Sequence, residues 1–318
     1  MNADPVRDEN GPAPESHLAT IAALEPVRGV RRRWPALLNI TVTIAMLVGL
    51  VNELLDHGLL GFERAVPDSP LFYVCFLAAY FTLPLSDLAI FRRLWNLPLS
   101  AFGALNRKRI ANDVLIGYTG DAYFYAWARQ KLKMVAAPFG AVKDVSIVSG
   151  MAGNTAALLL AAASLPLGYR LIDPGLLRTM LWSLATTALV MITVLALRRI
   201  VFSLSRRDLL FIFRLDVARI LIGALLTATA WHFAMPEVSL FMWLFLMAGR
   251  QLVSRLPFLP NKDLLFANFA ILIIGRDKAL SNLMAFTATT TLLLHVALLT
   301  LFGLIWVWER TAQWRTHG

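Results

Sequence analysis

The sequence predicts an all-α integral membrane protein, a polytopic bundle of helices. Hydrophobic residues make up 58% of its 318 positions, mean hydropathy is +0.64, and only 16% of the residues are charged. A soluble globular domain has about a quarter of its residues charged. The apolar residues also fall in runs of roughly 20, which is the length of a helix that crosses a bilayer. Composition and run length therefore predict the same fold class.

Apolar runs of this kind occur at about seven places, and each is expected to be one membrane span. They are residues 37–55, 70–91, 144–168, 176–197, 210–234, 238–256 and 281–308. Two semi-polar segments, 98–137 and 257–276, are expected to be broken or re-entrant rather than plain spans. Each of them lies between apolar spans, so the same order of elements occurs twice, a pattern compatible with two related halves.

The chain is expected to form one polytopic membrane domain, residues 34–310, between two tails. Residues 1–33 are polar and lack the apolar core of a signal peptide, which predicts a disordered cytoplasmic tail. Residues 311–318 form a short C-terminal tail. No link between the spans is long enough to hold a second, soluble domain.

The distribution of charge predicts the orientation. The net charge is +10, and basic residues are dense in 92–143 and 198–207 but sparse in 56–70. Because Lys and Arg beside spans mark the cytoplasmic side, we expect a multi-pass protein of the bacterial inner membrane with a cytoplasmic N-terminus. Anionic phospholipid headgroups are the expected partners of these residues, and nucleic acid is not.

No metal or other cofactor is expected. Cys75 is the single cysteine, which excludes a disulfide framework and a cysteine-based metal cluster. His232 and His295 are isolated, with no carboxylate or histidine at metal-ligand spacing. We interpret His295, in the middle of an apolar run, as a hydrogen-bonded packing residue rather than a proton relay.

The first semi-polar segment contains a break with candidate substrate-binding residues. These are Asn112, Gly117, Gly120, Asp121, Tyr125 and Arg129. The two glycines permit positive φ, so the chain can turn sharply there. Asp121 is expected at the N-cap of the following helix, with Tyr125 and Arg129 further along the same face. A helix N-terminus and an arginine can together hold a phosphate or carboxylate headgroup. The alternative is a capped interfacial helix anchored by its aromatic side chains.

A second break follows in the other half of the chain. Pro257 and Pro260 preclude a continuous helix, and Asp263 precedes another apolar run. Arg250 lies deeper in the preceding span and is expected to face a cavity, because a charge at membrane depth is costly unless it is satisfied. Paired breaks in two halves of a transporter usually meet at the binding site, so we expect both breaks at one cavity.

Two further patterns predict structure rather than function. Asp216 and Arg219 are spaced i, i+3 and are expected to neutralise each other on one helix. Ser146, Gly150 and Asn154 form a stripe of small residues, which predicts close packing of helix backbones.

One pattern in the first semi-polar segment has a known counterpart. It consists of Asn112, an apolar stretch, and then Gly120 and Asp121 at the start of a helix that carries Arg129. Together with the proline break that ends in Asp263, it resembles the lysylphosphatidylglycerol synthase transmembrane-region family, flippase-like proteins of the UPF0104 type. The resemblance covers roughly residues 37–308. The family usually has Pro at the position of Ile116 and Glu at that of Asp121. It also usually has Arg shortly after the acid, and a glycine-rich second break.

The resemblance implies a flippase-like protein that translocates or presents an amphipathic phospholipid or isoprenoid lipid between leaflets, and not an enzyme. The soluble synthase domain is missing from this sequence, so aminoacyl transfer is not implied. Two alternatives stay open. One is a membrane-embedded transferase that acts on a lipid-linked substrate, with Asp121 or Asp263 as base. The other is a non-transporting membrane partner of an envelope-lipid enzyme.

Overall fold

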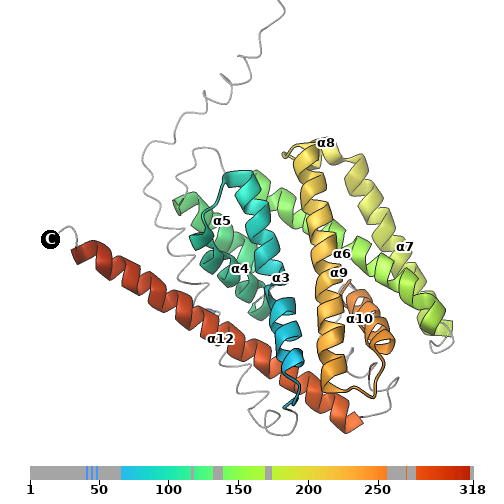
Figure 1. Cartoon of the computed structure of the whole chain (residues 1–318). Helices are drawn as coiled ribbons and strands as arrows, with labels where there is room; N and C mark the ends of the chain where they lie inside the picture. The colour runs from blue at the N-terminus through green and yellow to red at the C-terminus, as the bar shows by residue number, and fades with distance from the viewer. Residues whose placement is uncertain are drawn as a thin grey trace, which may run out of the picture.

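The computed structural model describes residues 66–115, 118–131, 139–168, 174–255 and 277–315, together with Thr41, Ile44, Ala45, Val48 and Ala270. Within these ranges the regular structure is helical and contains no strand (Figure 1). The described helices are α3 (Pro70–Trp95), α4 (Phe102–Val114), α5 (Thr119–Lys131), α6 (Phe139–Gly168), α7 (Pro174–Ala196), α8 (Arg198–Val201), α9 (Arg206–Ala234), α10 (Leu240–Arg255) and α12 (Asp277–Arg315), and a 3-10 turn lies at Leu99–Ala101.

Three of these helices are long and apolar enough to cross a membrane. The qualifying stretches are Pro70–Trp95 in α3, Phe139–Ala163 in α6 and Ala279–Ile305 in α12. The prediction of an all-helical membrane protein is confirmed to that extent. The predicted first span and the second break, with Pro257, Pro260 and Asp263, lie outside the described residues apart from a few isolated positions.

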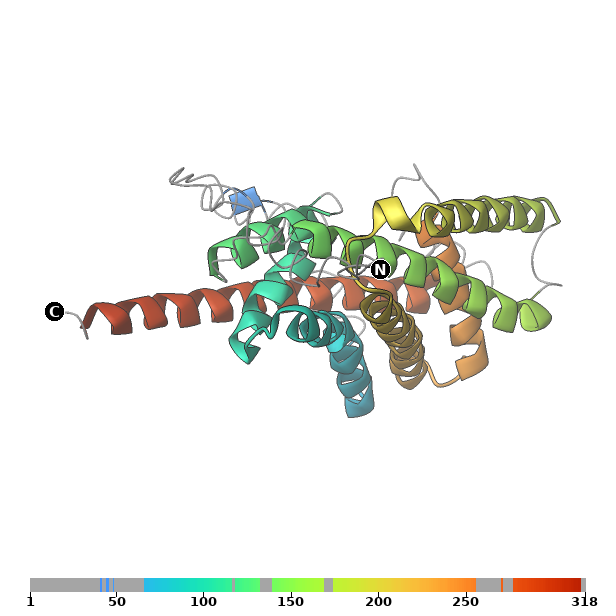
Figure 2. The same cartoon turned by 90° about the horizontal axis from the view of Figure 1, so that it is seen from above.

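Helix α9 is the centre of the arrangement. It packs along α3, α6 and α10, and α10 also packs on α6. Figure 1 shows α3 and α9 side by side, with α12 running obliquely past their lower ends. Figure 2, a view from above, shows how far α12 extends beyond the other helices toward the C-terminus. Helix α9 therefore connects elements that are far apart in the sequence.

Two apolar clusters hold the helices together. One is built around Phe91, Leu105 and Phe124, from α3, α4 and α5. The other is built around Phe72, Trp243 and Phe286, from α3, α10 and α12. Helices α3 and α9 contribute to both, so each runs from one cluster to the other. Asp87 of α3 and Asp216 and Arg219 of α9, which take part in the ion pairs described below, lie on these two helices.

The first semi-polar segment folds as two short helices packed together, α4 and α5. Each has 13 residues. At 1.5 Å per residue, such a helix is about 20 Å long, too short for a hydrocarbon core of about 30 Å. A broken segment is therefore present at the predicted place.

The details of the break differ from the prediction. Helix α5 begins at Thr119, so Asp121 lies inside its first turn and is not the N-cap. Tyr118 has a positive φ of 70°, and Gly120 is helical. The reason is that the carboxylate of Asp121 and the amide of Gly120 are both held by side chains of α4, which fixes them within the helix. Gly117 lies outside the described residues.

Candidate functional site

A buried ion-pair network joins α3, α4 and α5. The ammonium of Lys108 lies 2.9 Å from the Asp87 carboxylate and 3.3 Å from that of Asp121. Lys108 and Asp87 are both buried. Burial alone would lower the pKa of Lys108, but the two carboxylates outweigh it and hold this pKa above its ordinary value. Lys108 is therefore a permanent cation that fastens α4 to two other helices.

The joint between α4 and α5 is completed by Asn112 and Gly120. Asn112 Oδ1 accepts the Gly120 N–H at 2.7 Å, and Asn112 Nδ2 donates to Asp121 at 3.3 Å. Ser146 of α6 donates to Asp121 at 2.9 Å. A Cβ on Gly120 would lie 1.9 Å from the Lys108 carbonyl oxygen, so only glycine permits this approach of the two backbones. Asn112, Gly120 and Asp121 thus act together as a structural joint.

The network has a second centre on α9. Arg219 Nε donates to Asp216 at 2.9 Å, which confirms the predicted pair. Asp216 is fully buried and also accepts from Ser86 of α3 and Ser149 of α6. Arg219 and Asp216 lie close enough to Asp87 to interact with it electrostatically. The two centres therefore form one charged layer between α3, α4, α6 and α9.

The small-residue stripe on α6 was predicted to allow close backbone packing, and at Gly150 this is wrong. A Cβ added there would meet nothing within 4 Å. The serines near it serve a different purpose: Ser146 and Ser149 each donate a hydrogen bond to a buried carboxylate. This face of α6 satisfies charge on its neighbours.

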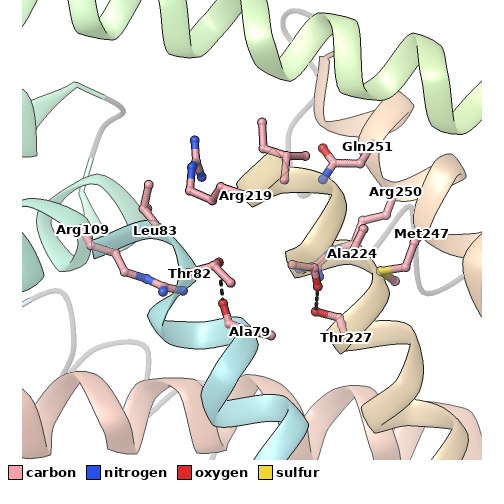
Figure 3. A pocket seen from close by; sticks show the side chains of 12 residues that line it. Ala79, Thr82, Leu83, Arg109, Arg219, Ala224, Thr227, Met247, Arg250 and Gln251 are labelled. Atoms are coloured by element: carbon pink, nitrogen blue, oxygen red, sulfur yellow. Dashed lines mark hydrogen bonds between the residues drawn. The ribbon is translucent and has the colours of Figure 1, made fainter. Parts of the chain in front are cut away.

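A cavity of roughly 440 Å³ lies beside this network, between α3, α4, α9 and α10. Its wall carries one arginine from each of three helices, namely Arg109 of α4, Arg219 of α9 and Arg250 of α10 (Figure 3). The remaining lining residues are small, apolar or neutral polar: Ala79, Thr82, Leu83, Ile220, Gly223, Ala224, Thr227, Met247 and Gln251. Among the lining residues that the structure describes, the cavity has cations and no carboxylate.

Arg109 is fixed at the cavity by groups on both sides. Its guanidinium stacks over the Tyr80 ring, 3.8 Å from the ring centroid, and donates to the Tyr80 carbonyl oxygen. Its Nε donates to Asp113 at 3.2 Å. Arg219 is likewise held by Asp216. Arg109 and Arg219 are therefore both oriented by protein groups outside the cavity.

The candidate binding residues predicted from the sequence lie in different parts of the structure. Asn112, Gly120 and Asp121 come together at the joint and are not among the cavity-lining residues. Arg250 lines the cavity, as its position in the span predicts. Tyr125 and Arg129 lie elsewhere on α5. The Tyr125 ring packs edge-on against Phe139, with centroids 5.9 Å apart, and Arg129 is exposed.

Sequence reasoning missed Asp87 and misread Lys108 and Arg109. The basic triplet that contains both cations looks like a cytoplasmic flank, yet Lys108 is buried and Arg109 faces the cavity. The available signal was Asp87, a carboxylate inside an apolar run. Such a group needs a cation from another segment.

No cluster of three or more histidine, cysteine or acidic side chains suited to a metal occurs in the part of the chain that the structure describes. The three guanidinium groups in the cavity wall offer recognition of negative charge. Comparisons with protein-family models, with curated proteins and with solved structures gave no match to this chain.

Proposed function

We propose that this chain is a flippase-like membrane protein that translocates or presents an amphipathic lipid with a phosphate-bearing, anionic headgroup. The observation that carries the proposal is the cavity with Arg109, Arg219 and Arg250 in its wall. A guanidinium group matches the oxygens of a phosphate and can bind them in pairs. Arginines at membrane depth are costly and commonly mark a substrate pathway.

The size and lining of the cavity suit a lipid headgroup. Ligand sites for small molecules commonly measure about 300–1,000 Å³, and this cavity, at roughly 440 Å³, lies in the lower part of that range. Leu83, Ile220 and Met247 provide apolar contact beside the cations. On α9, Ile222 is 51% and Leu225 is 48% exposed, so apolar surface is available next to the cavity for chains that stay in the bilayer.

The wider architecture in this proposal is the one that the sequence predicts. It comprises about seven spans, a second break at Pro257–Asp263 and two related halves, within the flippase-like family that the chain resembles. The orientation follows the Lys and Arg distribution, with the N-terminus and residues 198–207 in the cytoplasm of a bacterial cell. Labelling of a cysteine placed in 198–207, after replacement of Cys75, would test the orientation in intact spheroplasts. Modification by an impermeant reagent would overturn it.

The transferase alternative has less support. Asp121, one of its two candidate bases, accepts bonds from Lys108, Asn112 and Ser146. These protein donors already occupy both oxygens of the carboxylate, and Asp121 is not among the residues that line the cavity, so it is not placed to contact a headgroup bound there. The other alternative, a non-transporting partner of a lipid enzyme, gives the arginine-lined cavity no role.

The proposed function is tested by exchange of labelled lipid between leaflets in proteoliposomes. We expect the purified full-length chain to accelerate exchange of a fluorescent phosphatidylglycerol over protein-free vesicles. Exchange of an equally labelled zwitterionic phosphatidylcholine should be accelerated less, because its choline cation opposes the arginines. Equal rates for both lipids would remove headgroup recognition from the proposal, and no acceleration of either would remove transport.

A further inference from the structure

Polar side chains outside the charged layer differ in whether they reach the cavity. His295 of α12 is buried, and neither of its ring nitrogens has a hydrogen-bond partner among the described residues, so its interpretation as a hydrogen-bonded packing residue is wrong. His295 is not one of the cavity-lining residues, whereas Thr82 of α3 and Thr227 of α9 both are (Figure 3). These two threonines add neutral polar groups to a wall whose charged groups are arginines.

Both threonine hydroxyls donate their proton to a carbonyl of their own helix. Thr82 Oγ1 donates to the Ala79 carbonyl oxygen at 2.8 Å, and Thr227 Oγ1 donates to that of Gly223 at 2.8 Å. A hydroxyl has one proton and two lone pairs, so each oxygen is left to act as an acceptor. A phosphate oxygen is itself an acceptor and finds no donor at these two positions. The threonines and the arginines therefore suit different parts of a ligand.

Bonds of this kind are common for threonine in a helix, so the position of the oxygen is what matters. The same bond is made by Thr186, Thr193 and Thr229, which are not cavity-lining residues. The Thr82 oxygen, in contrast, faces α9 beside the cavity. A Cβ on Gly223, itself a lining residue, would lie 3.4 Å from this oxygen. Because glycine has no side chain, there is room for a ligand next to the oxygen.

The Thr82 oxygen also lies beside a cavity arginine. Arg109 donates to the Tyr80 carbonyl oxygen, and Thr82 donates to the carbonyl oxygen of the preceding residue, Ala79. Consecutive carbonyl groups of a helix are neighbours, so the guanidinium and the hydroxyl are held near each other on α3. Both residues line the cavity. A ligand whose phosphate binds Arg109 therefore has its adjoining atoms near a hydrogen-bond acceptor.

We propose that the cavity selects a headgroup that carries hydroxyl groups beside its phosphate, as in a polyol phosphodiester. The arginines bind the phosphate, and the oxygens of Thr82 and Thr227 accept hydrogen bonds from the hydroxyl groups. An ammonium group is also a donor, but its positive charge is repelled by Arg109, Arg219 and Arg250 in the same wall. A neutral hydroxyl is therefore the matching donor. This inference rests on the proposed function and names the class of substrate within it.

The test is calorimetric titration of the purified full-length chain in detergent with three dihexanoyl lipids. Phosphatidylglycerol and phosphatidylpropanol have the same charge and the same number of carbon atoms, and they differ in the two hydroxyl groups of the glycerol headgroup. Each neutral hydrogen bond is worth roughly two- to tenfold in affinity, so we expect phosphatidylglycerol to bind about tenfold more tightly than phosphatidylpropanol. Phosphatidylethanolamine, which offers an ammonium donor, should bind more weakly than phosphatidylglycerol.

Variants of the threonines locate the acceptors. Thr82→Val and Thr227→Val keep the shape of the side chain and remove its oxygen. Each should weaken binding of phosphatidylglycerol by roughly two- to tenfold and leave that of phosphatidylpropanol unchanged. Thr82→Ser keeps the oxygen and should keep the preference. Thr229→Val is the matched control, because Thr229 makes the same bond on α9 without lining the cavity.

Two further variants complete the test. Gly223→Ala places a methyl group at the ordinary contact distance of 3.4 Å from the Thr82 oxygen, so it should reduce the same preference. This variant serves if a valine variant does not fold. Arg250→Ala should weaken binding of phosphatidylglycerol and phosphatidylpropanol by the same factor, because both lipids carry the phosphate and the hydroxyl contacts are unchanged.

The outcomes separate this inference from the proposed function. Equal affinities of the wild type for phosphatidylglycerol and phosphatidylpropanol overturn hydroxyl recognition and leave the anionic headgroup site standing. Equal affinities for phosphatidylglycerol and phosphatidylethanolamine overturn the choice of a hydroxyl, because any donor then serves. A preference that persists in both Thr82→Val and Thr227→Val assigns the hydroxyl groups to other residues and also overturns the inference. Absence of binding of all three lipids overturns the headgroup site and, with it, this inference.

Discussion

The charged layer and the arginine-lined cavity are adjacent and share Arg219, but their charged groups have different surroundings. In the charged layer, Asp87, Asp121 and Asp216 each contact a cation. In the cavity wall, cations from three helices surround a space, and none of the described lining residues is a carboxylate. A buried ion pair that is fully satisfied fixes the packing of helices, whereas cations around a space are suited to a ligand. The comparison teaches that burial of charge alone does not identify a functional site.

The largest effect is expected from removal of the cation in the charged layer. Lys108→Met leaves Asp87 and Asp121 without the ammonium that both contact. Removal of one partner from a buried ion pair typically costs about 3–5 kcal/mol, because an uncompensated charge is left inside the protein. Thermal unfolding in detergent would measure the loss. Lys131→Met, on an exposed residue of α5, is the control and should change little.

A loss below about 1 kcal/mol for Lys108→Met would break the comparison, since it would show that the layer does not need its cation. In that case the charged layer would itself become a candidate site for ions or substrate.

The second-largest effect concerns the joint between α4 and α5. Gly120→Ala places a Cβ 1.9 Å from the Lys108 carbonyl oxygen, so the two backbones must separate. Overpacking of this kind costs about 1–3 kcal/mol, and we expect the upper end because the obstacle is backbone rather than a flexible side chain. Equilibrium unfolding would measure it.

Gly150→Ala on α6 is the matched control for the glycine prediction. Nothing lies within 4 Å of the added methyl group. Alanine is favoured over glycine in a helix by up to about 1 kcal/mol, so this variant should be neutral or more stable. Equal losses for Gly120→Ala and Gly150→Ala would contradict the close approach at the joint.

The helices were predictable and the partners of their charges were not. The lengths of the apolar runs predicted a span at 70–91, where the helix is Pro70–Trp95, and one at 210–234, where the helix is Arg206–Ala234. The break in 98–137 was visible because glycine and polar residues interrupt an apolar pattern. Each of these signals is local in the sequence, so periodicity and composition suffice.

The site depends on contacts across the chain. Lys108 and Asp87 are 21 residues apart, and Ser86 and Asp216 are 130 apart. A basic triplet beside an apolar run has the same local pattern whether its middle residue faces water or a buried carboxylate. Only the packing of α3 on α4 decides between these two environments. For the same reason, Arg109 could not be assigned to the cavity from sequence alone.

A third prediction tests the cavity side of the comparison. Arg250 is an exposed residue that lines the cavity, so Arg250→Ala should leave the free energy of unfolding almost unchanged. Loss of one charge-assisted contact to a phosphate corresponds to about a tenfold slower exchange of labelled phosphatidylglycerol. The double variant Arg206→Ala with Arg207→Ala removes two exposed arginines from the start of α9 and should exchange lipid at the wild-type rate. A wild-type rate for Arg250→Ala, or an equally slow double variant, would return Arg250 to a structural role.

The smallest effect on stability is expected from an ion pair at the surface, which serves as a reference for the charged layer and the cavity. Arg93 Nε donates to Asp208 at 2.9 Å, with side chains 44% and 28% exposed. The Ser205 hydroxyl donates to the same carboxylate, and these two bonds, with the serine the larger influence, hold the pKa of Asp208 below its ordinary value. Exposed pairs contribute about 0.2–1 kcal/mol, so Asp208→Asn should cost about a tenth of the loss expected for Lys108→Met.

The sign of the pH dependence follows from the lowered pKa of Asp208. Its contribution is complete above the ordinary pKa of an aspartate, about 4, and is lost as pH falls through the lower value of the folded state. The stability difference between the wild type and Asp208→Asn should therefore be measurable at neutral pH and disappear in acid. A double-mutant cycle with Arg93→Gln separates the ion pair from the bond to Ser205. If the surface pair cost as much as the buried one, burial would not be what makes the charged layer structural, and the contrast with the cavity would have to rest on geometry alone.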